Sequence, residues 1–237
     1  MSRLILLISL VPIILSVVIR KLFCDRGVRS AGDAKTSRTG RELADILLSK
    51  AGIASQVEIE EKRRAEVKVG KSVRLILTKR LAESTNVLAL GEVALLCGHA
   101  LVATSNPDLL KWRQWVVKFS FAFPIFSVVV LVFAVVVAKI PAGLGLAFAA
   151  AALGFGSLFS LLSLQVEVQG ARMMATIIDE SRVFPRLRES EAVARACKSL
   201  AYKQAVPGAI EILMGRDMER KIAKEVGRRV AGKVLRR

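Results

Sequence analysis

The chain has 237 residues, of which 53% are hydrophobic, yet it carries 37 Lys and Arg residues against 20 Asp and Glu residues. High apolar content together with high charge argues against a uniform soluble domain, and predicts apolar membrane spans separated from basic aqueous parts. The three cysteines, Cys24, Cys97 and Cys197, lie far apart without a C-x-x-C pair. Their number and spacing predict free thiols and argue against a cysteine-based metal site.

Residues 1–21 predict an N-terminal membrane anchor. Leu4 to Ile19 is an uncharged apolar run that ends at Arg20 and Lys21. A span needs about 20 apolar residues, and the long stems of flanking basic side chains can complete this short run. A cleaved signal peptide would have small residues where Arg20 and Lys21 stand, so we expect the anchor to be retained.

Residues 22–114 predict a small α/β domain that opens with a polar linker from Cys24 to Arg38. Thr39 and Glu42 have the spacing of a capping box, which predicts a helix from Thr39 to about Gly52. Alternating apolar residues then predict strands, and a longer apolar pattern predicts a helix at the end of the domain. We expect the strands at residues 57–60, 67–69 and 73–77, and the helix at residues 86–104.

Two further spans are predicted at residues 115–139 and 144–166. The first of these is rich in Phe and Val, and the second is rich in Gly and Ala, which predicts close packing between helices. Residues 167–237 predict a basic helical tail whose final helix runs from Ala209 to Leu235. The expected fold class is therefore a mostly α membrane protein with three transmembrane helices. A small α/β inner-side domain lies between spans one and two, and a basic helical C-terminal tail follows span three.

The basic residues predict how these spans are oriented. Nearly all Lys and Arg residues lie in residues 20–114 and 167–237, whereas the turn at residues 139–143 is nearly neutral. The positive-inside rule therefore places both charged regions on the cytoplasmic, matrix or stromal side, with the N-terminus outside. A bacterial inner membrane and an organellar inner membrane, mitochondrial or plastid, fit this pattern equally well.

The C-terminal tail predicts a negatively charged partner. Its basic residues favour the lipid bilayer, through anionic lipid, or an acidic protein. Nucleic acid is disfavoured because the tail lacks interleaved aromatic residues on which bases could stack. The residues concerned are Lys221, Lys224, Arg228, Arg229, Lys233, Arg236 and Arg237.

The only histidine of the chain, His99, lies in an incomplete metal-binding pattern. An H-E-x-x-H helix places two histidines on one face to bind zinc, and its glutamate acts as general base. Gly98 and His99 match the second half of this pattern, but Leu95 and Leu96 stand at the first histidine and the glutamate. The sequence therefore predicts no catalytic residues, no metal and no cofactor.

The order of these parts resembles the neutral zinc membrane metallopeptidases, often called YugP-like. Members of that family have an anchor, a domain opening with Thr-Gly, an Ala-His-Glu-x-Gly-His-Ala helix, two spans and a Pro-Val-Glu-Phe-Asp-Ala-Ser-x-Arg-Ala motif. Thr39-Gly40, Ala94 to Ala100, and Gln165 to Arg172 lie on these motifs. The resemblance covers residues 1 to 205.

The resemblance implies a peptidase ancestry in which the chemistry is degenerate. The aspartate and serine of the second motif fall on Gln169 and Ala171, while His99, Glu167 and Arg172 remain. In the family, the glutamate of the second motif is a candidate third zinc ligand, so His99 and Glu167 are residual metal-site candidates. The favoured interpretation is structural: His99 is hydrogen-bonded to Glu167 inside a helical bundle, or Glu167 pairs with Arg172.

Taken together, these features predict a catalytically inactive, metallopeptidase-like membrane protein that acts as a structural or scaffolding subunit of a larger membrane complex. Its partners would then be other membrane-complex subunits. One alternative is a metal-dependent membrane peptidase, or metal-binding protein, with a rearranged site that uses His99 and Glu167. A second alternative is a basic membrane adaptor that docks an RNA-containing particle.

Overall fold

The computed structural model describes residues 2–31, 34–70, 72–137 and 139–210. The basic residues predicted at 221–237, and nearly all of the final predicted helix, lie outside these ranges. The elements, in chain order, are α1 (Ser2–Ile19), a π-helix η1 (Arg20–Asp25), α2 (Arg26–Ala31), α3 (Gly40–Lys50), β1 (Val57–Glu61), β2 (Glu66–Val69), β3 (Val73–Leu77), α4 (Lys79–Glu83), α5 (Val87–Ser105), α6 (Pro107–Val137), α7 (Ala142–Glu180), α8 (Leu187–Ala201) and a 3-10 helix η2 (Tyr202–Ala205).

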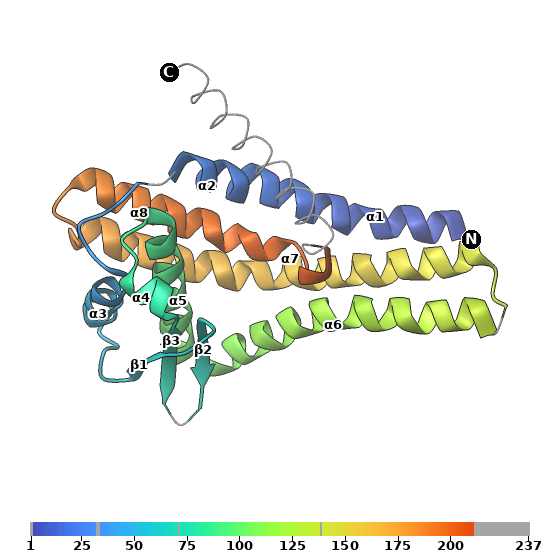
Figure 1. Ribbon diagram of the computed structural model, residues 1–237, viewed down its shortest axis with the longest axis horizontal. Helices are drawn as coiled ribbons and strands as arrows, with labels where there is room; N and C mark the ends of the chain where they lie inside the picture. The colour runs from blue at the N-terminus through green and yellow to red at the C-terminus, as the bar shows by residue number, and fades with distance from the viewer. Residues whose placement is uncertain (1, 32–33, 71, 138, 211–237) are drawn as a thin grey trace, which may run out of the picture.

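The N-terminal helical region extends well beyond the predicted anchor. α1, η1 and α2 follow one another to Ala31 without a break (Figure 1). The prediction of a linker beginning at Cys24 is therefore wrong as far as Ala31. Tertiary contacts account for the difference, because Phe23 stacks on Tyr202 with ring centroids 4.8 Å apart and α2 packs against α8. These contacts favour helix over the turn preference of Gly27 and Ser30.

The small α/β part follows the predicted elements closely. The Thr39 side chain accepts a hydrogen bond from the Glu42 backbone, and the Glu42 side chain accepts one from the Thr39 backbone, so the predicted capping box of α3 is confirmed. The three predicted strands are also confirmed, and they form a sheet in the order β1-β3-β2. β1 runs parallel to β3, whereas β2 and β3 are antiparallel.

The helix α5 is the core of this end of the molecule. It packs against α3, α7, α8 and the sheet, and its start is capped by the Asn86 side chain, which accepts a hydrogen bond from the Leu88 backbone. The predicted helix over residues 86–104 is thus confirmed. The short helix α4 lies between β3 and α5 and was not predicted.

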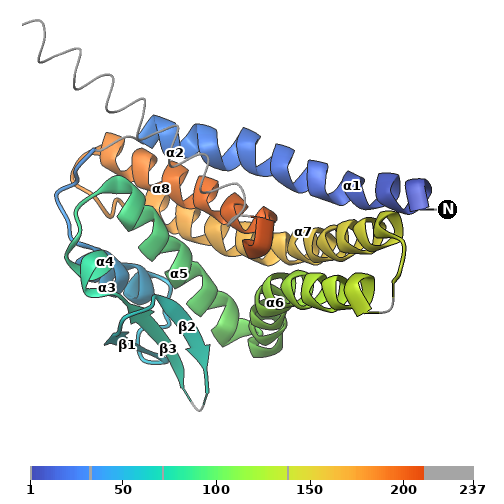
Figure 2. The ribbon, with the colours of Figure 1, turned by 45° about the vertical axis from the view of Figure 1, so that its right-hand side comes forward.

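Two long antiparallel helices, α6 and α7, complete the architecture. α7 lies between α1 and α6 over its first half, and continues alongside α5 and α8 over its second half (Figures 1 and 2). A Cβ on Gly154 of α7 would lie 2.6 Å from the Ser9 carbonyl oxygen of α1, so the close packing predicted for this glycine-rich helix is confirmed. The N-terminus and the α6–α7 connection lie together at the end of the bundle opposite the sheet (Figure 1).

Four helical segments among the described residues are long and apolar enough to cross a membrane: Leu7–Ala31, Val87–Ser105, Pro107–Val137 and Gly143–Glu180. They differ in how far the protein itself covers them. In the most apolar window, 61% of the α5 residues are buried, against 11% in α6 and 17% in the N-terminal segment. The apolar surface of α5 is therefore covered by protein, whereas α6 and the N-terminal segment present theirs outward.

Candidate functional site

The second half of α5 and the second half of α7 meet at two glycines. A Cβ on Gly98 would lie 2.5 Å from the carbonyl oxygen of Gly170, so the two backbones are too close to admit even an alanine without movement. His99 is the next residue in α5, and Glu167 lies one turn before Gly170 in α7. This close approach therefore brings both polar side chains to the same contact between helices.

A trio of polar side chains, His99, Glu167 and Arg113, occupies this contact, with His99 and Glu167 buried and Arg113 half-buried. His99 Nε2 lies 2.6 Å from Glu167 Oε2, and only 4% and 1% of the two side chains are exposed. Arg113 Nε and Nη2 both lie 2.5 Å from Glu167 Oε1. A carboxylate paired with arginine only accepts hydrogen bonds, so His99 Nε2 carries the proton in this pair. Both oxygens of Glu167 are thus satisfied by protein donors.

The start of α6 positions Arg113. α6 begins at Pro107, directly after the Asn106 cap of α5, and a proline is well tolerated at the first position of a helix. The Gln114 side chain donates a 2.6 Å hydrogen bond to the Val67 carbonyl oxygen of β2. The edge of the sheet therefore fixes the first turns of α6 so that Arg113 is directed at Glu167.

The structure brings together some of the predicted site residues and separates others. The predicted pairing of His99 with Glu167 is present, but the alternative partner Arg172 is exposed and makes no ion pair with Glu167. Leu95 and Leu96 are half-buried and pack against the hydrophobic core. Sequence reasoning missed Arg113. One signal was available: Arg113 is a charged residue near the start of an apolar helix. Such a residue is a candidate partner for a carboxylate that is buried within an apolar segment.

Comparison with protein families decides the ancestry of this arrangement. A family model described as "putative neutral zinc metallopeptidase" matches residues 3–213. The chain belongs to this family. The resemblance inferred from the motifs is therefore confirmed at the level of the family. Searches of curated proteins and of solved structures returned no match.

The residues at the contact do not fit the zinc that the family name implies. A catalytic zinc has three protein ligands and an open position for water. No group of three or more His, Cys, Asp or Glu side chains within the described ranges could hold a metal ion. Both oxygens of Glu167 are occupied, and the guanidinium of Arg113, a permanent cation, lies on one of them. A second cation at this carboxylate would be repelled by Arg113.

Two cysteines lie beside this contact but add no reactive group. Cys97 of α5 and Cys197 of α8 are free and fully buried. The Cys197 thiol donates a weak 3.8 Å hydrogen bond to the Ala171 carbonyl oxygen, and burial raises its pKa to about 12. A thiol with so high a pKa carries almost no thiolate at neutral pH, so it is neither a nucleophile nor a ready metal ligand.

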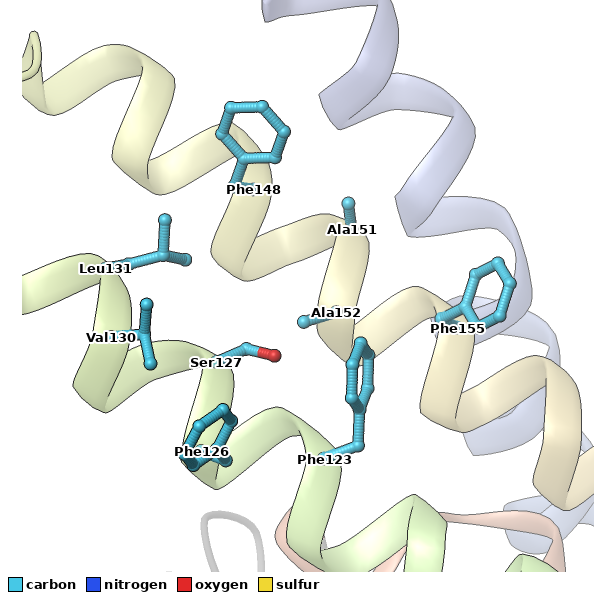
Figure 3. A pocket seen from close by; sticks show the side chains of 9 residues that line it. All are labelled: Phe123, Phe126, Ser127, Val130, Leu131, Phe148, Ala151, Ala152 and Phe155. Carbon is cyan, nitrogen blue, oxygen red and sulfur yellow. The ribbon is translucent and has the colours of Figure 1, made fainter. Parts of the chain in front are cut away.

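A hollow of about 430 Å³ lies between α6 and α7 in the apolar bundle, apart from the trio (Figure 3). Ser127 supplies the one hydroxyl among the described lining residues, which are otherwise apolar and include no titratable side chain. Acid–base or nucleophilic chemistry needs such groups, so this hollow has no catalytic equipment. The lining residues are Phe123, Phe126, Ser127, Val130, Leu131, Phe148, Ala151, Ala152 and Phe155.

Proposed function

We propose that this chain is a catalytically inactive member of its family that spans a membrane and serves as a structural subunit of a larger membrane assembly. The observation that carries the proposal is the trio at the α5–α7 contact. Where the family motif has a histidine and a glutamate, this chain has Leu95 and Leu96, and the remaining Glu167 is held by Arg113 and His99. An ion-paired, hydrogen-bonded trio then joins three helices without providing a metal ligand set or a general base.

The exposed surface of α1, α6 and the first half of α7 supports insertion in a membrane. Large apolar side chains such as Val129, Phe133 and Phe148 are more than half exposed there, which is costly in water and favourable in lipid. Trp112 and Trp115 are exposed at the sheet end of α6, as expected for residues at a membrane interface. With the basic small domain on the inner side, the N-terminus and the α6–α7 connection lie outside, as the charge pattern predicts.

Inactivity is tested by a peptidase assay on the purified, detergent-solubilised protein, with casein and a pool of unstructured peptides as substrates. We expect no cleavage above a mock preparation. His99→Ala and Ser55→Ala form the matched pair, because Ser55 is exposed and remote from the trio. Cleavage that is retained in Ser55→Ala and lost in His99→Ala would establish the rearranged metal site as the correct interpretation.

The structural role is tested separately, by purifying the native protein in a mild detergent and identifying its companion chains by mass spectrometry. We expect the same membrane proteins at constant stoichiometry over successive size-exclusion steps. A chain that elutes alone under these conditions would contradict the structural role, whatever the result of the peptidase assay.

A further inference from the structure

Another hollow, of about 950 Å³, lies beside the first half of α5, whereas the trio lies at the second half of that helix. Its wall is built from the β1–β2 loop, α4 and α5, with single residues from α2 and α8. The lining residues are Val28, Arg63, Arg64, Ala65, Thr78, Arg80, Leu81, Ser84, Asn86, Leu88, Ala89, Glu92 and Leu200. The size of this hollow is at the upper end of the range for ligand pockets.

The charge around this hollow is one-sided. Arg63, Arg64 and Arg80 are exposed, and none of them makes an ion pair with another described residue. Their sequence neighbours Lys62 and Lys79 do pair, with Glu60 and Glu83 respectively. The two paired lysines are not among the described lining residues, whereas three guanidinium groups without a carboxylate partner border the hollow.

The lining of the hollow combines polar and apolar side chains in similar measure. Leu81 is buried, and Leu88, Ala89 and Leu200 are half-buried, so the hollow also offers an apolar surface beside the arginines. Glu92 is the one acidic residue among the described residues of the lining. An occupant that matches this surface carries several negative charges at its edges and at least one apolar side chain that is buried beneath them.

We propose that this hollow docks an acidic segment of a partner protein, with an apolar side chain against Leu88 and carboxylates on Arg63, Arg64 and Arg80. Arginine pairs with carboxylates through two parallel hydrogen bonds, and arginine clusters are a recurrent means of recognising acidic motifs. The proposal deepens the structural role by naming the chemistry of the partner, and it rests on that role.

Charge excludes other occupants. Residues 211–237 of this chain are themselves basic, and a second copy would bring a net charge of +17. A lone phosphate is also a poor match, because no described lining residue is a glycine and the three exposed arginines come from two separate segments, the β1–β2 loop and α4. Anionic lipids also combine negative charge with apolar chains, so the experiment separates them from protein.

The test uses full-length protein in detergent and a fluorescein-labelled 12-residue peptide of alternating Glu-Glu-Leu units, followed by fluorescence anisotropy. We expect saturable binding that weakens on addition of salt. The combined substitutions Arg63→Ala, Arg64→Ala and Arg80→Ala should weaken it roughly tenfold or more, since three exposed ion pairs are lost. The control variant Lys50→Ala, Arg188→Ala and Arg195→Ala removes the same charge from exposed positions outside the hollow and should bind normally.

Equal weakening in both variants would show a general charge effect and would overturn the proposal, as would unchanged binding in the Arg63, Arg64 and Arg80 variant.

The lipid alternative is examined with vesicles of phosphatidylglycerol in phosphatidylcholine. Vesicle binding that needs these arginines, alongside peptide binding that does not, would assign the hollow to lipid. A photoreactive group on the peptide should crosslink to residues 63–65 or 78–92, and crosslinks confined to other segments would also contradict docking here. The peptide-binding experiment measures neither zinc content nor peptidase activity. A negative result would therefore reject docking at this hollow without bearing on the proposal that the chain is catalytically inactive.

Discussion

The two halves of α7 are built for different surroundings, although they belong to one uninterrupted helix. The first half packs small residues such as Gly154 against α1, and exposes large ones such as Phe148 and Phe155. The second half buries Glu167 against His99 of α5 and Arg113 of α6, and exposes polar residues such as Gln169. One half thus directs its apolar side chains outward and the other directs them inward.

This contrast shows how each half is held in place. In the first half, close backbone approach and van der Waals packing join the helices, and no ion pair between described residues contributes. In the second half, close approach at Gly98 and Gly170 sets the distance, and the trio then fixes the register of three helices through specific hydrogen bonds. A polar trio specifies alignment because only one arrangement satisfies all its members.

The largest effect is expected from removing the charge partner in the second half. Arg113→Met leaves the Glu167 carboxylate buried with only His99, which should lower the free energy of unfolding by about 3–5 kcal/mol. Urea unfolding in detergent, followed by circular dichroism, measures the change. The double variant Arg113→Met with Glu167→Leu should recover most of the loss, because no unpaired charge remains. A double variant as unstable as the single one would contradict this account, because removing the unpaired charge would then recover nothing.

A charge placed on the outer surface of the bundle tests the first half. Val129→Arg puts a guanidinium on the most apolar part of α6, at a cost of about 2.5–3.5 kcal/mol for insertion. The expected result is a large increase in the fraction extracted from membranes by alkaline carbonate. Leu187→Arg, at an equally exposed apolar residue of α8, should leave extraction unchanged. If both variants behave alike, the outer surface of α6 does not face lipid.

The glycine contact in the second half should respond more moderately. Gly98→Ala forces α5 away from the Gly170 carbonyl, and we expect a loss of about 1–3 kcal/mol from overpacking. Gly143→Ala is the matched control, since a Cβ there meets nothing within 4 Å. Thermal unfolding in detergent compares the two, and an equal response would remove the steric argument.

The smallest effect is expected in the small domain. Thr39→Ala removes the capping box of α3, which should destabilise the fold by about 1 kcal/mol. Ser55→Ala, at an exposed loop residue, provides the baseline. The measurement is the midpoint of chemical unfolding, and a midpoint equal to that of the baseline variant would show that this cap contributes nothing.

Local signals made much of the fold predictable. The Thr39 and Glu42 spacing, the alternating strands and the long apolar runs each reflect interactions within a few residues, so α3, the sheet and α5 to α7 could be inferred from the sequence. The extension of the first helix to Ala31 could not, because it depends on contacts with Tyr202 and α8 that are distant along the chain. The short helix α4 likewise lacks a periodic pattern of its own.

The candidate site was predictable only in part. The pairing of His99 with Glu167 followed from the motifs, but Arg113 belongs to no motif and reaches Glu167 only through the direction in which α6 leaves α5. The arginine-lined hollow was equally hidden. In the sequence, nothing distinguishes Arg63, Arg64 and Arg80 from ordinary exposed charges. Only the fold, through the sheet and α4, places them around one hollow.

The central claim, that the Arg113–Glu167–His99 trio stands in place of a zinc site, is tested most directly by the zinc content of the protein purified in mild detergent without chelators. Elemental analysis should show only background zinc, equal in the natural sequence and in His99→Ala. One zinc per chain in the natural sequence, reduced to background in His99→Ala, would contradict the claim and would return His99 and Glu167 to a metal centre.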